Sequence, residues 1–415
     1  LFKLSAPDII HLNPVSRTCP VFSSSKDAEV CKMIFSKYGI LDTNNDDDSS
    51  RWDIVPYRMF DMTNDSNLFI STIEPQTAVT HDSERLPLFV AKMFHHFNHR
   101  FRDYMMKESD KEGHNLPDIP IEFSRDPFYS TTPPYFIPES EVRRRVCVDW
   151  QRHWFVTYRW VARSSDERTL IISVMPYGGF GNSSPILILK EHTLSSLPAL
   201  VSMLSSFMVD YVVRCKHGGA NLTFTTIKQI PVLSPPYFKK PVPWSQNVSI
   251  IDWVLPRFLE LTYTAWDLSA FAKDYGHYSS PFVWDDVRRF LLRCELDAAF
   301  FHLYLSTTTD GQWKPARIAD GAVCDGTNEE LAELKRHFPT PRDVVAYIMD
   351  TFPIVRRKDE QNFNGDYRTK RVILEIYDEM AEAIKTGKSY QTRLDPPPAD
   401  PRCCHPPKQI QQREG

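Results

Sequence analysis

Five prolines lie between residues 231 and 243 and divide the sequence into two parts of different character. Proline cannot continue a helix because it lacks a backbone N–H and clashes with the preceding turn. Before this cluster, short apolar runs alternate with loops and a few helical segments; after it, apolar residues recur at helical spacing. The chain holds 32 prolines against 14 glycines, which predicts long, stiff connections between elements.

These patterns predict an α+β protein in four parts. We expect helices and loops in residues 1–140, a mixed α/β unit in residues 141–243, and an α-helical domain in residues 244–390. Residues 391–415 are rich in proline and almost without large apolar side chains, which predicts a disordered tail. A chain of 415 residues is ample for a substantial core.

The individual elements follow from the spacing of apolar residues. Strands are predicted at residues 154–160 and 169–176, with a turn at residues 164–167 between them. Thr340 followed by Pro341 and an acid at position 343 is a typical helix start. Helices are predicted at residues 27–38, 85–104, 194–213, 253–263, 284–304, 328–338, 342–352 and 366–385.

The composition is that of an ordinary globular protein, with 42% hydrophobic and 25% charged residues. No apolar run reaches the roughly 18–20 residues needed to span a bilayer, and no signal-peptide pattern opens the chain. We therefore expect a cytoplasmic protein with no membrane partner. The first residue is Leu1, as expected for an interior segment of a longer polypeptide.

Positive charge is concentrated in one part of the chain. Residues 141–240 carry 13 Lys/Arg against 6 Asp/Glu, whereas the whole chain has a net charge of −4. A basic segment in an otherwise acidic protein indicates a surface that contacts phosphate, although solvated surface charges can produce the same count.

The basic segment supplies the candidate DNA contacts. Guanidinium groups suit this role because they pair with phosphate and with the O6 and N7 atoms of guanine. Two neighbouring glycines at 218 and 219 would allow the backbone to approach a phosphate closely, and the asparagine that follows either bonds an adenine edge or caps the turn. The candidates are Arg143, Arg144, Arg145, Arg159, Arg163, Arg168, Arg214, Lys216 and Asn221.

Two motifs imitate a methyltransferase. PYGGFG at residues 176–181 is similar to a loop that holds S-adenosylmethionine, and SPPY at residues 234–237 is similar to the box that holds a flipped base. A cofactor site of this kind needs a β-α-β unit with an acid after the second strand, and the residues between the two motifs predict one long helix instead. We therefore predict no catalytic residue in this chain, and its status as an enzyme stays open.

Metal and nuclease motifs are equally weak. His95, His96 and His99 fall on the predicted helix 85–104, but the zinc-peptidase motif requires a glutamate where His96 stands, and there is no third ligand. Histidines that pack or form hydrogen bonds within a helical interface are the better interpretation. Glu333-Leu334-Lys335 lies in a charged helical run, so we interpret it as a solvated helix face and predict no metal site.

Blocks of sequence along residues 10–380 resemble large adenine-specific DNA methylases of the type IIG restriction-modification kind and of DISARM phage-defence systems. Residues 202–236 resemble the closing element of their target-recognition domain. One block departs from the family, because Ser23, Ser24 and Ser25 stand where arginines are usual. The other similar blocks are residues 13–35, 58–66, 91–101, 159–176, 292–304, 345–360 and 365–380.

The resemblance implies a function for the chain. The intact enzyme would methylate adenine N6 at a specific site after flipping the base, using S-adenosylmethionine bound by a catalytic domain upstream of Asn13. This chain would be the target-recognition portion: it would bind double-stranded DNA, hold no cofactor itself, and need a methylase catalytic domain or subunit from another polypeptide. The alternatives are a stand-alone DNA-binding specificity subunit and a complete methyltransferase that uses PYGGFG and SPPY.

Overall fold

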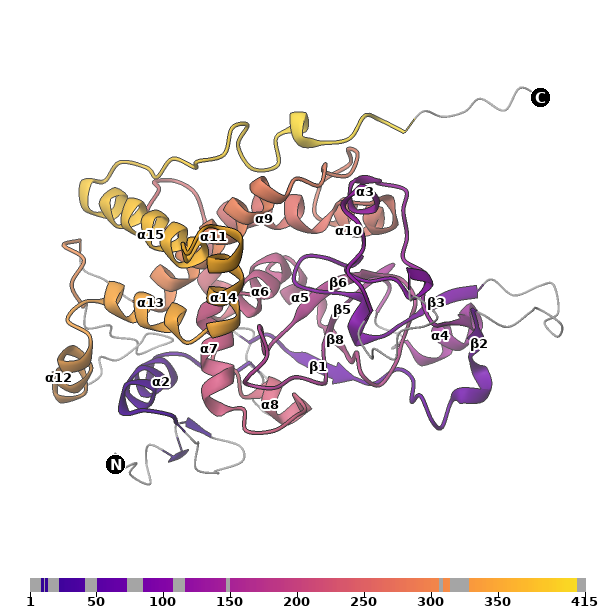
Figure 1. The fold of residues 1–415 in the computed structure, drawn as a ribbon, viewed down its shortest axis with the longest axis horizontal. Coiled ribbons are helices and arrows are strands. Elements are labelled where there is room, and N and C mark those ends of the chain that lie inside the picture. The colour runs from indigo at the N-terminus through magenta and orange to yellow at the C-terminus, as the bar shows by residue number, and fades with distance from the viewer. Residues whose placement is uncertain are drawn as a thin grey trace.

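The chain folds into two small β-sheets and many helices, and most helices lie on the left and along the top of Figure 1, so the α+β prediction is confirmed. The computed structural model describes residues 9–10, 12–13, 22–41, 51–72, 85–106, 116–146, 150–305, 309–313 and 328–408. Within these ranges the strands all lie before residue 190, and the regular elements after residue 249 are all helical.

The first sheet is antiparallel throughout and has the strand order β1-β8-β5-β6. Its strands are β1 (Ile54–Tyr57), β5 (Trp154–Tyr158), β6 (Ile172–Pro176) and β8 (Ile186–Leu189). Every residue of β5 is buried, as are the first four of β6, so both faces of these strands are covered. The predicted strands at residues 154–160 and 169–176 are therefore confirmed.

Part of the second sheet lies where we predicted a helix. Its order is β2-β4-β3-β7, and β3 (Arg85–Phe89) begins the segment that we predicted as a helix at residues 85–104. Pro87 cannot donate a helical hydrogen bond, and β3 instead pairs with β4 (Tyr135–Pro138) and β7 (Gly179–Phe180). Strand β2 (Ile70–Ser71) lies at the edge.

The chain after β3 is irregular and is organised by the buried guanidinium of Arg100. This group donates hydrogen bonds of 2.7–3.3 Å to the backbone carbonyls of Phe123, Ser124, Asp126, Tyr129 and Thr264. Burial lowers the pKa of Arg100, but carbonyl oxygens accept hydrogen bonds from both of its terminal nitrogens. Contacts with residues distant in sequence thus replace the predicted helix.

The predicted helix at residues 194–213 is also wrong as a single element. It consists of α5 (Glu191–Leu194), α6 (Leu197–Leu204) and α7 (Phe207–Lys216), and α6 and α7 meet at 58°. The carboxylate of Asp297 accepts the N–H of Phe207 at 2.7 Å, so α7 begins with a capped N–H group. In the described ranges no single helix is long and apolar enough to cross a membrane; only the bent α6–α7 pair reaches that length and composition.

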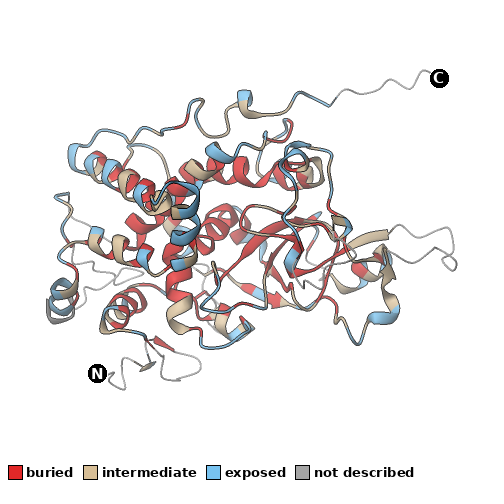
Figure 2. Cartoon of the chain, viewed as in Figure 1, coloured by how far each residue is buried: buried red, intermediate tan, exposed pale blue. Residues whose placement is uncertain are grey.

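A layer of helices covers the sheets. Helix α11 (Asp286–Tyr304) lies at its centre and contacts α7, α9 (Ile250–Thr262) and α15 (Arg368–Thr386). Buried residues are concentrated in these central helices and in the first sheet (Figure 2). The other predicted helices are confirmed as α2 (Ser25–Lys37), α12 (Asn328–His337) and α13 (Pro341–Asp350). Thr340 and Asp343 form the predicted helix start as a capping box.

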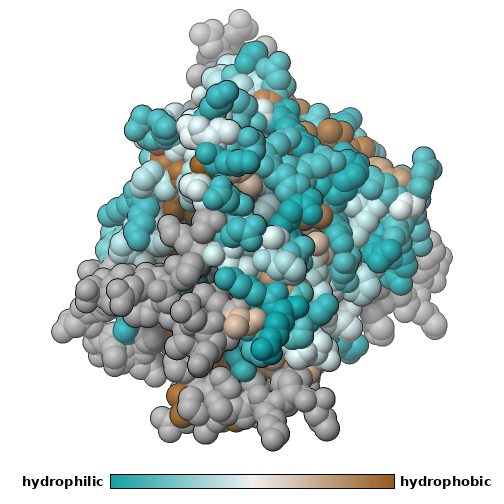
Figure 3. Space-filling model, turned by 90° about the vertical axis from the view of Figure 1, so that its left-hand side faces the viewer, coloured by the Kyte–Doolittle hydropathy of each residue, from teal (hydrophilic) through white to brown (hydrophobic). Residues whose placement is uncertain are grey.

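Buried apolar residues form one continuous cluster from Leu12 to Leu394 within the described chain. Helix α6 packs on α9, and α7 packs on α11 and α13, so apolar contacts cross the predicted boundary at residue 243. The division into domains stays a prediction. Figure 3 shows the end of the molecule where α12 and α13 lie, and hydrophilic side chains cover most of its visible surface.

The prediction of a disordered tail is wrong for residues 391–408. This segment is mostly extended and runs over the helical layer (Figure 1), where Thr392 bonds the buried carboxylate of Glu295. Further along, Val283 N–H donates to the Cys403 carbonyl at 2.8 Å. The composition correctly indicated that this segment has little regular secondary structure. Its place is fixed by hydrogen bonds to the carboxylate of Glu295 and to the backbone of Val283. Residues 409–415 lie outside the described ranges.

Candidate nucleic-acid interface

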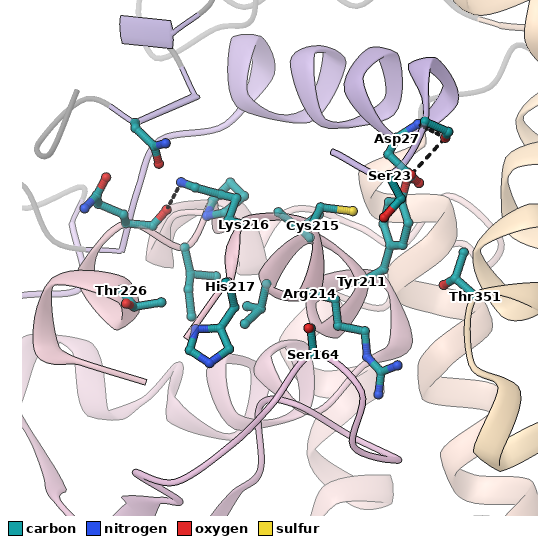
Figure 4. Close-up of a pocket in the computed structure, with 18 of the residues that line it drawn as sticks. Ser23, Asp27, Ser164, Tyr211, Arg214, Cys215, Lys216, His217, Thr226 and Thr351 are labelled. Atoms are coloured by element: carbon teal, nitrogen blue, oxygen red, sulfur yellow. Dashed lines mark hydrogen bonds between the residues drawn. The ribbon is translucent and has the colours of Figure 1, made fainter. Parts of the chain in front are cut away.

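A cleft of about 810 Å³ lies beside the C-terminal end of α7, where the candidate residues Arg214 and Lys216 are found. It is lined by the start of α2, the last turn of α7, the short helix α8 (Phe224–Lys228) and the end of α13. Figure 4 shows Arg214, Lys216 and His217 leaving the end of α7 in different directions. The cleft therefore places basic side chains among the hydroxyl groups of neighbouring serines and threonines.

Two loops beside this cleft, residues 160–168 and residues 217–223, are bonded to each other; we call them the paired loops. Three contacts join them: Ala162 N–H to the Ala220 carbonyl (3.1 Å), Leu222 N–H to the Trp160 carbonyl (2.7 Å), and His217 Nε2 to the Ala162 carbonyl (2.9 Å). Loops far apart in sequence thus form one surface of fixed relative geometry.

The paired loops expose the groups that the sequence analysis associated with DNA. Arg163, Gly218, Gly219 and Asn221 are all exposed. No heavy atom lies within 4 Å of the position that a Cβ would occupy at Gly218, so the backbone there is open to a ligand. An exposed guanidinium, an exposed amide and accessible backbone therefore lie on one surface.

Lys216 points from α7 into the same cleft. Its Nζ lies 3.5 Å from the Gln229 carbonyl and 4.1 Å from the centre of the Phe35 ring. Burial lowers the pKa of Lys216 to about 8, because an ammonium loses hydration in this position. Neighbouring groups therefore stabilise the charge of Lys216 only weakly, and its ammonium loses its proton at a lower pH than an exposed lysine does.

Arg168 and Arg214 have internal partners. Arg168 donates to the buried carboxylate of Asp210 at 2.7 Å, and Arg214 donates to the Glu167 carbonyl at 2.7 Å. Only 10% and 9% of the two side chains are exposed. Asp210 also accepts the N–H of Thr169 at 2.9 Å. These arginines hold the first of the paired loops on α7, and contact with DNA would require breaking those bonds.

Arg159 is likewise directed inward. Its Nε donates to the Phe94 carbonyl at 3.1 Å, and its guanidinium lies 5.6 Å from the centre of the Phe101 ring. Burial lowers the pKa of Arg159 to about 10. The structure therefore places this candidate in the packing of the strand β5 region, away from solvent.

The triple-arginine candidate lies elsewhere. Arg143, Arg144 and Arg145 belong to α4 (Glu139–Arg145), which lies at the right of Figure 1, whereas α7 lies left of the centre. Arg145 pairs with Asp65 through two bonds of 2.7 and 2.8 Å. The other two are exposed and pair with glutamates of their own helix. The nine candidates therefore do not form one surface.

The sequence analysis missed a hydrogen-bonded carboxylate in the cleft. Asp27 accepts the hydroxyl groups of Tyr211 and Tyr347, each at 2.8 Å, and is also bonded to Ser24. Ser24 and Asp27 have the spacing of a helix start, which signalled the capping role of the pair. Nothing in the local sequence indicated the two tyrosines, which lie on α7 and α13.

The methyltransferase-like motifs have structural roles. Gly179 belongs to β7, and a Cβ at Gly178 would lie 2.8 Å from both the Phe89 ring and the Pro87 carbonyl. These glycines permit close packing against β3 rather than opening a helix that would face a cofactor, so they do not fit S-adenosylmethionine. In SPPY, Ser234 precedes a short 3-10 helix (Pro235–Lys239).

The histidines do not lie on a helix, so that part of the prediction is wrong. His99 bonds the carboxylate of Asp267 at 2.8 Å, and burial lowers its pKa. Among the residues that the structure describes, no three His, Cys, Asp or Glu side chains gather as metal ligands would. Glu333 pairs with Arg336 on the exposed surface of α12, as a solvated helix face predicts.

Comparison with protein-family models, with curated proteins and with solved structures found no match to this chain.

Proposed function

We propose that this chain is the DNA-binding target-recognition portion of a site-specific adenine-N6 DNA methyltransferase of a restriction-modification or phage-defence system. In this proposal the catalytic domain and its S-adenosylmethionine belong to a different stretch of polypeptide, and the protein acts in the cytoplasm. The methylase part of the proposal rests on the blocks of sequence that resemble that family. The DNA-binding part rests on the surface formed by the paired loops.

The observation that carries the DNA-binding part is that Arg163, Gly218 and Asn221 are exposed on the paired loops, beside the cleft that Lys216 and Gly218 line. The four residues come from two segments about fifty positions apart, and hydrogen bonds fix the paired loops. Guanidinium and ammonium groups contact phosphates, open glycine backbone allows close approach, and an amide can read an adenine edge. This combination suits duplex DNA.

The proposal predicts a modest dependence on salt. Arg145, Arg159, Arg168 and Arg214 have internal partners, so fewer cations face solvent than the sequence count suggests. Each phosphate neutralised contributes roughly −0.9 to the slope of log affinity against log salt. Arg163 and Lys216 together should therefore contribute about −2.

Fluorescence anisotropy with labelled duplex DNA, over a range of NaCl concentrations, tests this proposal. We expect binding that weakens with salt, and a slope reduced by about 1 in each of Arg163→Gln and Lys216→Gln. Arg336→Gln, which removes an exposed arginine on α12, is the matched control and should leave the slope unchanged. Absence of binding in dilute buffer would exclude a DNA-binding role.

A second variant locates the surface. Arg143→Ala combined with Arg144→Ala removes two exposed cations from α4. If this variant reduces the slope and the paired-loop variants do not, the DNA contact lies on α4 instead.

The methylase part needs its own test. The purified chain, mixed with duplex DNA and S-adenosylmethionine, should transfer no methyl group without a catalytic polypeptide. Methylation of adenine by the chain unaided would refute the assignment as a recognition portion.

A further inference from the structure

A second cavity, of about 290 Å³, lies among the helices and shares no lining residue with the cleft beside the paired loops. It is bounded by residues 95–97, the α6–α7 junction, α11, α14 (Pro353–Asn362) and the start of α15. Glu167 and Arg168, at the end of the first paired loop, also line this cavity, whereas the proposed DNA contacts Arg163, Lys216 and Asn221 do not.

The floor of this cavity carries polar groups without partners. Among the described residues, neither ring nitrogen of His96 has a hydrogen-bond partner, and neither hydroxyl of Ser202 and Ser205 has one. These residues are only 6%, 1% and 4% exposed. An unsatisfied buried polar group costs about 1–3 kcal/mol, and native proteins contain few of them. Three such residues line one cavity, where a ligand with donors and acceptors would supply the partners.

The polar groups of the floor can both donate and accept hydrogen bonds. Burial lowers the pKa of His96 well below its usual value, so its imidazole offers one N–H and one lone pair. Burial raises the pKa of Asp297 to about 6. One oxygen of Asp297 accepts the Phe207 N–H at 2.7 Å, and its carboxyl group also lines the cavity.

The walls of the cavity are aromatic. The side chains of Phe97, Phe207, Phe290 and Phe363 line it, together with Leu296. Such walls favour a flat ring, which gains contact area and offset stacking at little cost in conformational entropy. A flat ring with several hydrogen-bonding atoms would satisfy both the walls and the floor.

Unpaired cations lie at the exposed mouth. The Arg293 residue is exposed, and no hydrogen bond or ion pair joins its guanidinium to a described residue. The Arg368 guanidinium lies over the rings of Phe290 and Phe363, at 4.1 and 4.6 Å, and within the described chain it has no carboxylate partner. Two acids, Glu167 and Asp359, also line the cavity; Glu167 pairs with Lys358, and Asp359 accepts the Thr369 N–H at 2.6 Å. The mouth therefore favours an anionic group.

We propose that this cavity binds a nucleoside monophosphate, with the base between the phenylalanines above His96, Ser202 and Ser205, and the phosphate at Arg293 and Arg368. A free anion would leave the polar groups of the floor without hydrogen-bond partners. An apolar ligand would leave both these groups and the two guanidinium groups of the mouth without partners. A nucleobase carries donors and acceptors on a flat ring, and its phosphate matches a pair of guanidinium groups.

Isothermal titration calorimetry on the full chain tests the proposal with AMP, GMP, CMP and UMP, with the matching nucleosides and with inorganic phosphate. At least one nucleotide should bind, and its nucleoside and phosphate alone should bind at least tenfold more weakly. Arg293→Gln and Arg368→Gln should each weaken the nucleotide about tenfold, the effect of losing one charge-assisted hydrogen bond, and leave the nucleoside unchanged. Arg371→Gln, on the same helix but outside the cavity, is the matched control.

Three outcomes would overturn the proposal. The first is no binding by any of the four nucleotides at millimolar concentration. The second is phosphate binding as tightly as the nucleotide, which would make the mouth an anion site only. The third is loss of nucleotide binding in Arg163→Gln or Lys216→Gln, which would place the nucleotide on the proposed DNA surface. Because Arg293 is exposed, its substitution should not impair folding, and thermal unfolding without ligand checks this.

Discussion

The carboxylate of Glu295 on α11 pairs with the guanidinium of Arg257 on α9 at 2.7 Å, and both side chains are almost wholly buried. Glu295 also accepts the hydroxyl groups of Tyr390, at 2.9 Å, and Thr392, at 2.5 Å. One buried carboxylate thus joins two helices to the C-terminal segment. Among the described residues, its three hydrogen-bond partners lie 38, 95 and 97 positions away in the sequence.

Glu295→Ala should destabilise the protein strongly. The substitution leaves the Arg257 guanidinium buried without its carboxylate and removes the partners of two hydroxyl groups, and breaking a buried pair in this way costs about 3–5 kcal/mol. Urea denaturation followed by circular dichroism measures the loss. Glu333→Ala, which breaks an exposed pair on α12, should cost at most about 1 kcal/mol. Equal effects of the two substitutions would contradict the central role of Glu295.

Gly178→Ala should also destabilise the fold. The added Cβ would lie 2.8 Å from the Phe89 ring and 2.8 Å from the Pro87 carbonyl, so the second sheet must shift to accept it. Overpacking of this kind costs roughly 1–3 kcal/mol. Gly218→Ala meets no atom within 4 Å and serves as the control in the same unfolding experiment. If Gly178→Ala is as stable as Gly218→Ala, close packing does not explain the glycine at position 178 of the PYGGFG motif.

The elements that could be predicted are those specified by neighbours in sequence. Helix α13 has its apolar spacing and its capping box within a few residues, and β5 is a run of aromatic and β-branched residues. The failures all involve a distant partner. Asp297 caps the start of α7 from 90 positions away, and Arg100 organises its segment by bonding carbonyls up to 164 positions away. Such contacts leave no local pattern.

The candidate site could be predicted in part. Arg163 and Asn221 are exposed on the paired loops as DNA contacts should be, although the sequence did not show that the loops are bonded to each other. An arginine looks the same in sequence whether it faces solvent or a buried carboxylate, so Arg168 could not be separated from Arg163. The cavity above His96 was missed because its residues come from segments with no shared motif.

DNA affinity should fall as pH rises from 7 to 9. Burial lowers the pKa of Lys216 to about 8, so its ammonium loses its proton in this range and the proposed phosphate contact loses its charge. Anisotropy titrations at pH 7, 8 and 9 and constant ionic strength measure the change. Lys216→Gln should bind more weakly at pH 7 and show a smaller loss of affinity above it. An identical pH profile in both proteins would show that Lys216 does not contact the DNA.

Asp297 should make the folded state less stable as pH rises from 4 to 6. Burial raises its pKa from 3.8 to about 6, so the folded protein keeps a proton that the unfolded chain releases. The penalty is complete above pH 6 and amounts to about 3 kcal/mol. Asp297→Asn removes this titration, so the stability of the native protein relative to the variant should decline by about that amount between pH 4 and pH 7.

The comparison with Asp297→Asn is necessary because a buried histidine acts in the opposite direction. Burial lowers the pKa of His302 to about 4, so His302 makes the protein more stable as pH rises through the same range. That contribution is common to both proteins and cancels in the difference between their urea unfolding free energies. Asp286→Asn, an exposed position on the same helix, is the control and should show no such trend. A difference between native protein and Asp297→Asn that does not vary with pH would show that Asp297 titrates as a solvent-exposed acid.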